Sequence, residues 1–152
     1  MRQHTSTILG ILLLIGSTTV WGDEVGKLKV VDCPKTLEKE ALDVASTLRD
    51  WDALHVAYMR FLPCDDGAIA EGFTESVVRI LVEHWASLGR LSKFAKKDPS
   101  FLRFVYRHIT SSADPEDLKR IQNNLKKHGC PTANCEICRE VELAVIRALD
   151  EM

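Results

Sequence analysis

The chain has 152 residues, a formal net charge of −2 and 45% hydrophobic residues. This length suits one domain with a single core, and nothing in the charge pattern resembles a basic nucleic-acid-binding surface. Charge is nevertheless uneven, because residues 23–76 hold 12 acidic and 6 basic side chains, whereas residues 77–152 hold 10 and 13. The acidic first half suits a basic partner, and a solvated surface with uneven charges is the alternative.

The first 22 residues have the pattern of a secretory signal peptide. Arg2 supplies positive charge, residues 8–16 are a short apolar run, and Val20-Trp21-Gly22 ends in a small residue suited to cleavage. The sequence therefore predicts a signal peptide at 1–22 and one all-helical domain at 23–152, in a periplasmic or secreted protein. An uncleaved anchor is the alternative, and no later apolar run reaches the roughly 18 residues that a membrane span needs.

Apolar residues recur every three or four positions along the rest of the chain, and no segment alternates like a strand. This spacing predicts an all-α fold of about seven short helices, as an antiparallel bundle or a short solenoid of helical repeats. The predicted helices cover residues 34–48, 51–62, 68–85, 87–97, 101–109, 115–128 and 134–149.

Aspartates stand where these helices begin. Asp50, Asp98 and Asp114 each precede a predicted helix, and an aspartate side chain accepts the free N–H groups of a first helical turn. For the longest predicted helix, residues 68–85, the capping residue is Asp65 or Asp66. For the helix predicted at residues 101–109, Ser100 is the alternative cap to Asp98.

Five cysteines in an exported protein predict disulfides. Cys33 precedes the first helix and Cys64 follows the second, so an antiparallel hairpin brings them together at its open end. For the tail we prefer Cys130–Cys138, which leaves Cys135 free. Two alternatives remain for this tail cluster: a zinc site that adds His128, and a redox-active Cys-x-x-Cys.

The stretch CDDGAIAEGF, residues 64–73, is the most unusual part of the sequence. A helix start needs one capping aspartate, yet this stretch holds two, and Glu71 and Glu75 share the following helix face. Asp65, Asp66, Glu71 and Glu75 are therefore predicted to form an acidic ridge, fixed by the Cys64 disulfide, that binds a basic protein surface.

The sequence favours binding over catalysis. It contains no metalloprotease, nucleophile-elbow, phosphate-loop or dinucleotide-binding motif, and we expect neither a cofactor nor a metal. One alternative is a cell-wall hydrolase that uses Asp66 and Glu71 as an acid–base pair. The other is a helical scaffold without a dedicated site.

Three segments carry a resemblance: WDAL at residues 51–54, CDDGAIAEGF at 64–73 and FLRFVYRHI at 101–109. They resemble a group of small exported bacterial helical proteins without an established activity. In size, export signal and helix content the chain is also similar to periplasmic immunity proteins, which neutralise toxins passed between bacteria. This similarity implies an inhibitor whose partner is a basic toxin or hydrolase, and it assigns no residue a role.

Overall fold

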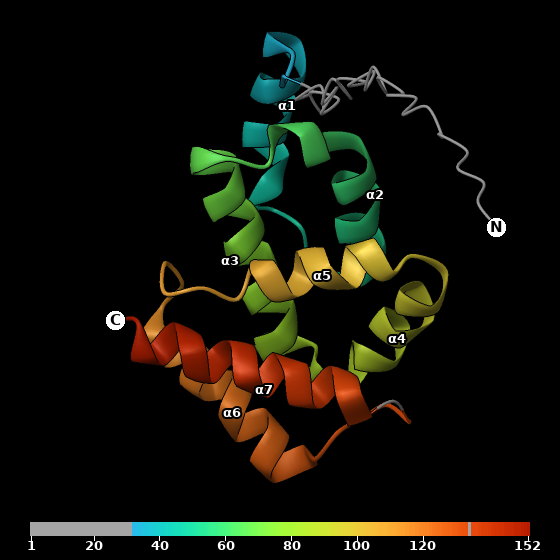
Figure 1. Ribbon diagram of the computed structural model, residues 1–152, viewed down its shortest axis with the longest axis vertical. Coiled ribbons are helices and arrows are strands. Elements are labelled where there is room, and N and C mark those ends of the chain that lie inside the picture. The colour runs from blue at the N-terminus through green and yellow to red at the C-terminus, as the bar shows by residue number, and fades with distance from the viewer. Residues whose placement is uncertain (1–31, 134) are drawn as a thin grey trace, which may run out of the picture. The chain divides into compact units, whose positions relative to one another are not determined.

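A computed structural model describes residues 32–133 and 135–152, and the described residues are helical with no strand (Figure 1). The α-helices are α1 (Lys35–Ala45), α2 (Trp51–Phe61), α3 (Gly67–Glu83), α4 (Leu88–Lys97), α5 (Pro99–Arg107), α6 (Pro115–His128) and α7 (Cys135–Asp150). Two 3₁₀ helices are η1 (Leu62–Cys64) and η2 (Trp85–Ser87). The predicted all-α class is thus confirmed, whereas the predicted signal peptide lies outside the described residues. None of the described helices is long and apolar enough to cross a membrane.

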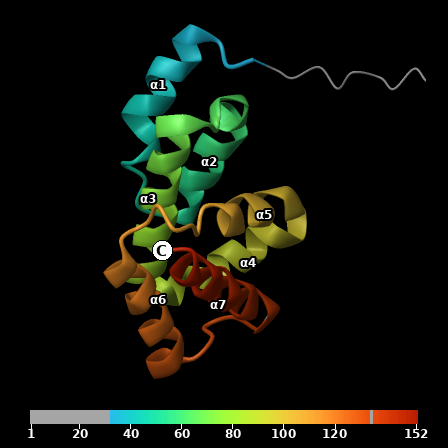
Figure 2. The ribbon, with the colours of Figure 1, turned by 60° about the vertical axis from the view of Figure 1, so that its left-hand side comes forward.

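Helix α3 lies in the middle of the described bundle and packs against α1, α2 and α6. Figures 1 and 2 show α1 and α2 beside one end of α3 and the α6–α7 pair beside the other. Helices α5 and α7 run across the direction of α3 (Figure 1). The architecture is therefore a helical bundle, as predicted, in which α5 and α7 cross the direction of α3.

The helix starts follow the aspartate pattern. The carboxylates of Asp50, Asp98 and Asp114 accept backbone N–H groups of the first turns of α2, α5 and α6. At α3 the capping residue is Asp66, which accepts the N–H of Gly67 at 2.8 Å. Each cap satisfies an N–H that a helix leaves unpaired, which typically stabilises the fold by about 1 kcal/mol.

The two glycines of CDDGAIAEGF are required for different reasons. Gly67 has a φ of +50°, a left-handed conformation that side chains disfavour. Gly72 lies where α3 meets the end of α1, and a Cβ there would stand 2.9 Å from the Ala45 Cβ and 3.1 Å from the Ser46 nitrogen. The absence of a side chain at Gly72 lets the two helices approach this closely.

Side chains of α3 satisfy the carbonyl end of α1 at the same crossing. Ser76 donates its hydroxyl to the Ala45 carbonyl at 2.6 Å and accepts the N–H of Leu48 at 3.2 Å. Arg79 donates to the Ser46 carbonyl at 2.9 Å. Because Ser76 holds the Leu48 backbone in a turn, α1 ends at Ala45 and the predicted extension to residue 48 is wrong.

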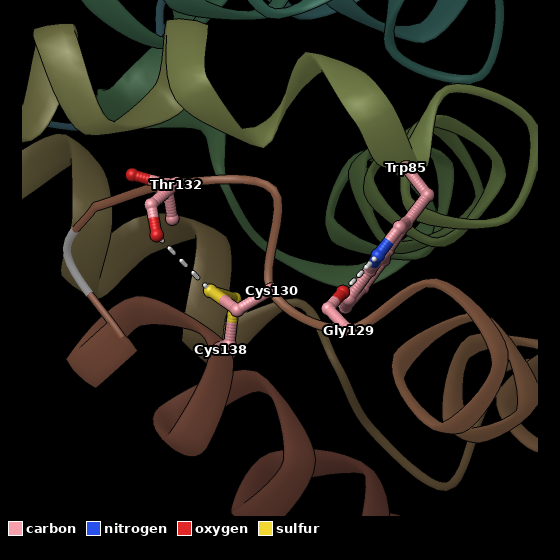
Figure 3. The surroundings of a disulfide bond; sticks show 5 residues. All are labelled: Trp85, Gly129, Cys130, Thr132 and Cys138. Carbon is pink, nitrogen blue, oxygen red and sulfur yellow. Dashed lines mark hydrogen bonds between the residues drawn. A yellow bond between two sulfur atoms is a disulfide. The ribbon is translucent and has the colours of Figure 1, made fainter.

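Two further helix ends are satisfied by neighbouring elements. Asn124 of α6 donates its amide to the Leu81 and Val82 carbonyls at the end of α3. Trp85 of η2 donates its indole N–H to the carbonyl of Gly129, just after α6, at 2.9 Å (Figure 3). Helix carbonyl ends otherwise lack partners, so these contacts fix how the helices pack.

Both predicted disulfides are confirmed: Cys33–Cys64 ties the start of α1 to η1, and Cys130–Cys138 ties the α6–α7 connection to α7 (Figure 3). Cys135 is free and exposed. The pairing takes up two of the four ligands of the alternative zinc site. By the chain-entropy model, the 31-residue separation of the first disulfide corresponds to about 3–4 kcal/mol of stability.

Gly72→Ala is expected to lower the free energy of unfolding by about 1–3 kcal/mol, because the added methyl group forces the α1–α3 crossing apart. Urea denaturation monitored by circular dichroism measures the change.

Gly89→Ala is the matched control. Its Cβ would meet only the Pro131 oxygen, at an ordinary 3.8 Å, and alanine favours helix, so this variant should be as stable as the wild type or up to about 1 kcal/mol more stable. Equal stability of Gly72→Ala and Gly89→Ala would contradict the close-approach account.

Candidate functional site

The four carboxylates of the predicted ridge are separated by the fold. Asp66, Glu71 and Glu75 are exposed, whereas the Asp65 side chain is only 3% exposed. Asp66 caps α3, and Glu75 pairs with Arg79 one turn later. The structure therefore leaves Asp65 out of the exposed ridge and keeps Glu71 and Glu75 as its accessible part.

Asp65 is the centre of a buried polar cluster. Its carboxylate pairs with Arg107 and His108, which are adjacent residues at the end of α5. On its other side the His108 ring lies 3.2 Å from the hydroxyl of Thr74 on α3, measured from Nδ1 to Oγ1. Asp65 precedes α3, Thr74 lies within α3 and His108 follows α5, so the cluster joins these three places. The side chains of all three residues are almost fully buried.

The pKa of Asp65 is lowered from its ordinary value of 3.8. Burial alone would raise this pKa, but the hydrogen bond and charge of His108, together with the charge and hydrogen bond of Arg107, outweigh burial. The Asp65 carboxylate is consequently ionised at neutral pH, and it stabilises the fold by holding α5 against α3.

Glu71 and Glu75 line a groove of about 510 Å³ between α3 and the connection from α5 to α6. Figures 1 and 2 show this connection passing beside α3. Asp114 and Asp117, at the start of α6, line the opposite wall. These four carboxylates, from segments about 40 residues apart, define what we call the acidic groove.

The acidic groove keeps an unbalanced negative charge. Glu75 pairs with Arg79, and Asp117 pairs with Arg120 through an exposed contact. Glu71 makes no ion pair with any other described residue, and Asp114 uses its carboxylate to cap α6. The Asp117–Arg120 pair is exposed and therefore weak, so a partner's cations can compete for Asp117 at little cost, whereas the Arg79 side chain that pairs with Glu75 is only 16% exposed.

A smaller pocket of about 300 Å³ adjoins the acidic groove and shares Glu71, Thr74 and Ser112 with it. Asp65, Arg107 and His108 form the rest of its polar wall. We call it the Asp65 pocket. It contains the carboxylates of Asp65 and Glu71 and the guanidinium of Arg107.

A separate groove of about 340 Å³ runs between α1 and α2 and is mainly apolar, with Val44, Leu48, Ala53 and Val56 among its lining residues. Val56 is 67% exposed. This groove lacks the charge imbalance of the acidic groove, because its carboxylates, Glu40 and Asp52, pair with Arg60 and Arg90.

Sequence reasoning missed four residues of this region: Asp114, Asp117, Arg107 and His108. In the sequence Asp114 is a helix-start signal, and nothing local shows that any of these four residues faces α3 or Asp65. Among the described residues, no three or more His, Cys, Asp or Glu side chains are placed to hold a metal ion. Comparisons with protein-family models, curated proteins and solved structures find no match to the chain.

Asp65→Asn is expected to lower the free energy of unfolding at pH 7 by about 1.5–3 kcal/mol, because it removes the charge from a buried carboxylate that accepts from Arg107 and contacts His108. In the wild type the folded pKa of Asp65 is depressed, so its contribution is present above pH 3.8 and is lost as pH falls through the folded value. The variant should therefore lose less stability than the wild type on acidification below pH 4. Urea denaturation over a pH series measures both effects.

Asp66→Asn is the control for this experiment, since asparagine caps a helix as well as aspartate does. It should retain the wild-type stability at pH 7. An Asp65→Asn variant as stable as the wild type, with the same acid dependence, would show that the buried ion pair contributes nothing.

Proposed function

We propose that this chain is an exported binding protein that holds a basic surface of a protein partner in the acidic groove. The observation that carries the proposal is the convergence of Glu71, Glu75, Asp114 and Asp117 on one groove from two separate segments. Complementary charge speeds the encounter of two proteins and fixes how they dock.

The groove is built on a rigid support, which favours binding. One wall belongs to α3, the most buried helix, and the other begins at the end of α5, where the buried His108 is held between Asp65 and Thr74. A surface held in place before binding loses little conformational freedom when the partner arrives, so more of the contact energy appears as affinity.

The partner in this proposal is a toxin, and binding inhibits it. The two disulfides support an oxidising compartment, as expected for an exported protein. The similarity in size and helix content to periplasmic immunity proteins supports the toxin assignment. Basic residues at the active site of a hydrolase would be the complementary feature that the groove covers.

Glu71→Lys/Glu75→Lys is expected to weaken binding at least about tenfold, mainly through slower association, because two attractive contacts become repulsive. The partner is first captured from the source organism with the oxidised mature protein and identified by mass spectrometry. Its affinity for the wild type and the double variant is then measured by biolayer interferometry at two salt concentrations.

Glu38→Lys/Asp43→Lys makes the same change in net charge on exposed residues of α1 and is the matched control. It should bind like the wild type, and thermal unfolding should show both double variants folded. A partner that binds the groove variant and the α1 variant with equal affinity would refute the assignment of the groove.

A further inference from the structure

The Asp65 pocket contains a buried acceptor without a donor. The Asp65 oxygen Oδ2 accepts from Arg107 and lies 3.2 Å from His108 Nε2. The other oxygen, Oδ1, is 3.1 Å from the same nitrogen, but no contact with hydrogen-bond geometry reaches it. A buried polar atom left unpaired costs about 1–3 kcal/mol, and native proteins rarely leave one so.

The buried part of this pocket has unmet acceptors, whereas its unmet donors are the remaining N–H groups of the exposed Arg107 side chain. The ring nitrogens of His108 are engaged by Asp65 and Thr74, and Arg107 is engaged by Asp65. Asp65 Oδ1 and the Glu71 carboxylate remain. A ligand that completes the pocket must therefore supply several donors and a positive charge.

Arg107 is the wall residue that can give way. Its side chain is 61% exposed, whereas those of Asp65 and His108 are 3% and 4% exposed. Its guanidinium contacts only Oδ2 and leaves Oδ1 without a donor, although Oδ1 is closed to solvent. Arg107 thus satisfies only one of the two carboxylate oxygens of Asp65. It also competes with any external cation for this carboxylate.

A compact ammonium suits this carboxylate better than a second guanidinium. An ammonium has three donors on a narrow alkyl stem, whereas a guanidinium is a wide planar fork that needs both oxygens of a carboxylate in one plane. His108 stays bonded to Oδ2 and blocks that fork. Once Arg107 has moved away, a lysine ammonium can bond the carboxylate that Arg107 leaves while its stem lies along the pocket toward Glu71.

We propose that the Asp65 pocket receives a lysine side chain of the protein partner, and that its ammonium displaces Arg107 from Asp65. This inference rests on the proposed function for the identity of the partner, since the acidic groove leads into the pocket through Glu71, Thr74 and Ser112. The pocket itself can be tested without the partner.

The test uses a terminally blocked Gly-Lys-Gly tripeptide as the probe, with Gly-norleucine-Gly and Gly-Arg-Gly as comparisons. Binding is followed through the imidazole NMR signals of His108. We expect a saturable shift with the lysine peptide at millimolar concentration, weaker binding of the arginine peptide and none of the norleucine peptide.

Arg107→Gln should tighten binding of the lysine peptide at least about fivefold, because the internal competitor is gone. Glu71→Gln should weaken it about threefold or more. Arg103→Gln, on the same helix, and Glu83→Gln, on the exposed strip of α3, are the matched controls and should leave the affinity unchanged.

Three results would overturn the inference: no saturable shift in either the wild type or Arg107→Gln, equal affinity of these two proteins, or tighter binding of the arginine peptide. The peptide experiment needs no partner, so its failure leaves the acidic groove proposal standing. Conversely, a partner that binds Glu71→Lys/Glu75→Lys with the wild-type affinity would refute the acidic groove proposal. Binding of the lysine peptide by the wild type would still support the lysine-binding pocket.

Discussion

The burial of α3 is the constraint on which the rest of the structure depends. Beyond its first turn the exposed residues of this helix are Glu71, Glu75 and Glu83, which are four and eight residues apart and form one strip with the partly buried Arg79 between the last two. Every other face is covered by neighbouring elements, so function on α3 is confined to this strip. The α5–α6 connection lies along part of it, and the acidic groove is the space between them.

Long-range polar contacts set the geometry around this buried helix. Ser76 and Arg79 hold the end of α1, Asn124 holds the end of α3, and Asp65 holds the end of α5. Each contact satisfies a polar group that burial would otherwise leave unpaired, so packing and hydrogen bonding select the same arrangement. These contacts keep the walls of the acidic groove in place.

The sequence predicted local features well and distant ones poorly. Asp50, Asp98 and Asp114 were identified as caps because a cap and its N–H partners lie within three residues. Cys33 and Cys64 were paired because a helical hairpin fixes where its ends meet. Asp65 was assigned to the surface because its partners, Arg107 and His108, are about 40 residues away, and no periodicity shows such a contact. Gly72 gave no signal for the same reason.

Hydrogen–deuterium exchange of the protein with and without its captured partner tests the central claim most directly, because it maps the contact surface without a mutation. The account predicts slower exchange in residues 110–117, which form the outer wall of the acidic groove, and no change in α2. Protection confined to α2 and the apolar groove beside α1, with residues 110–117 unchanged, would contradict it.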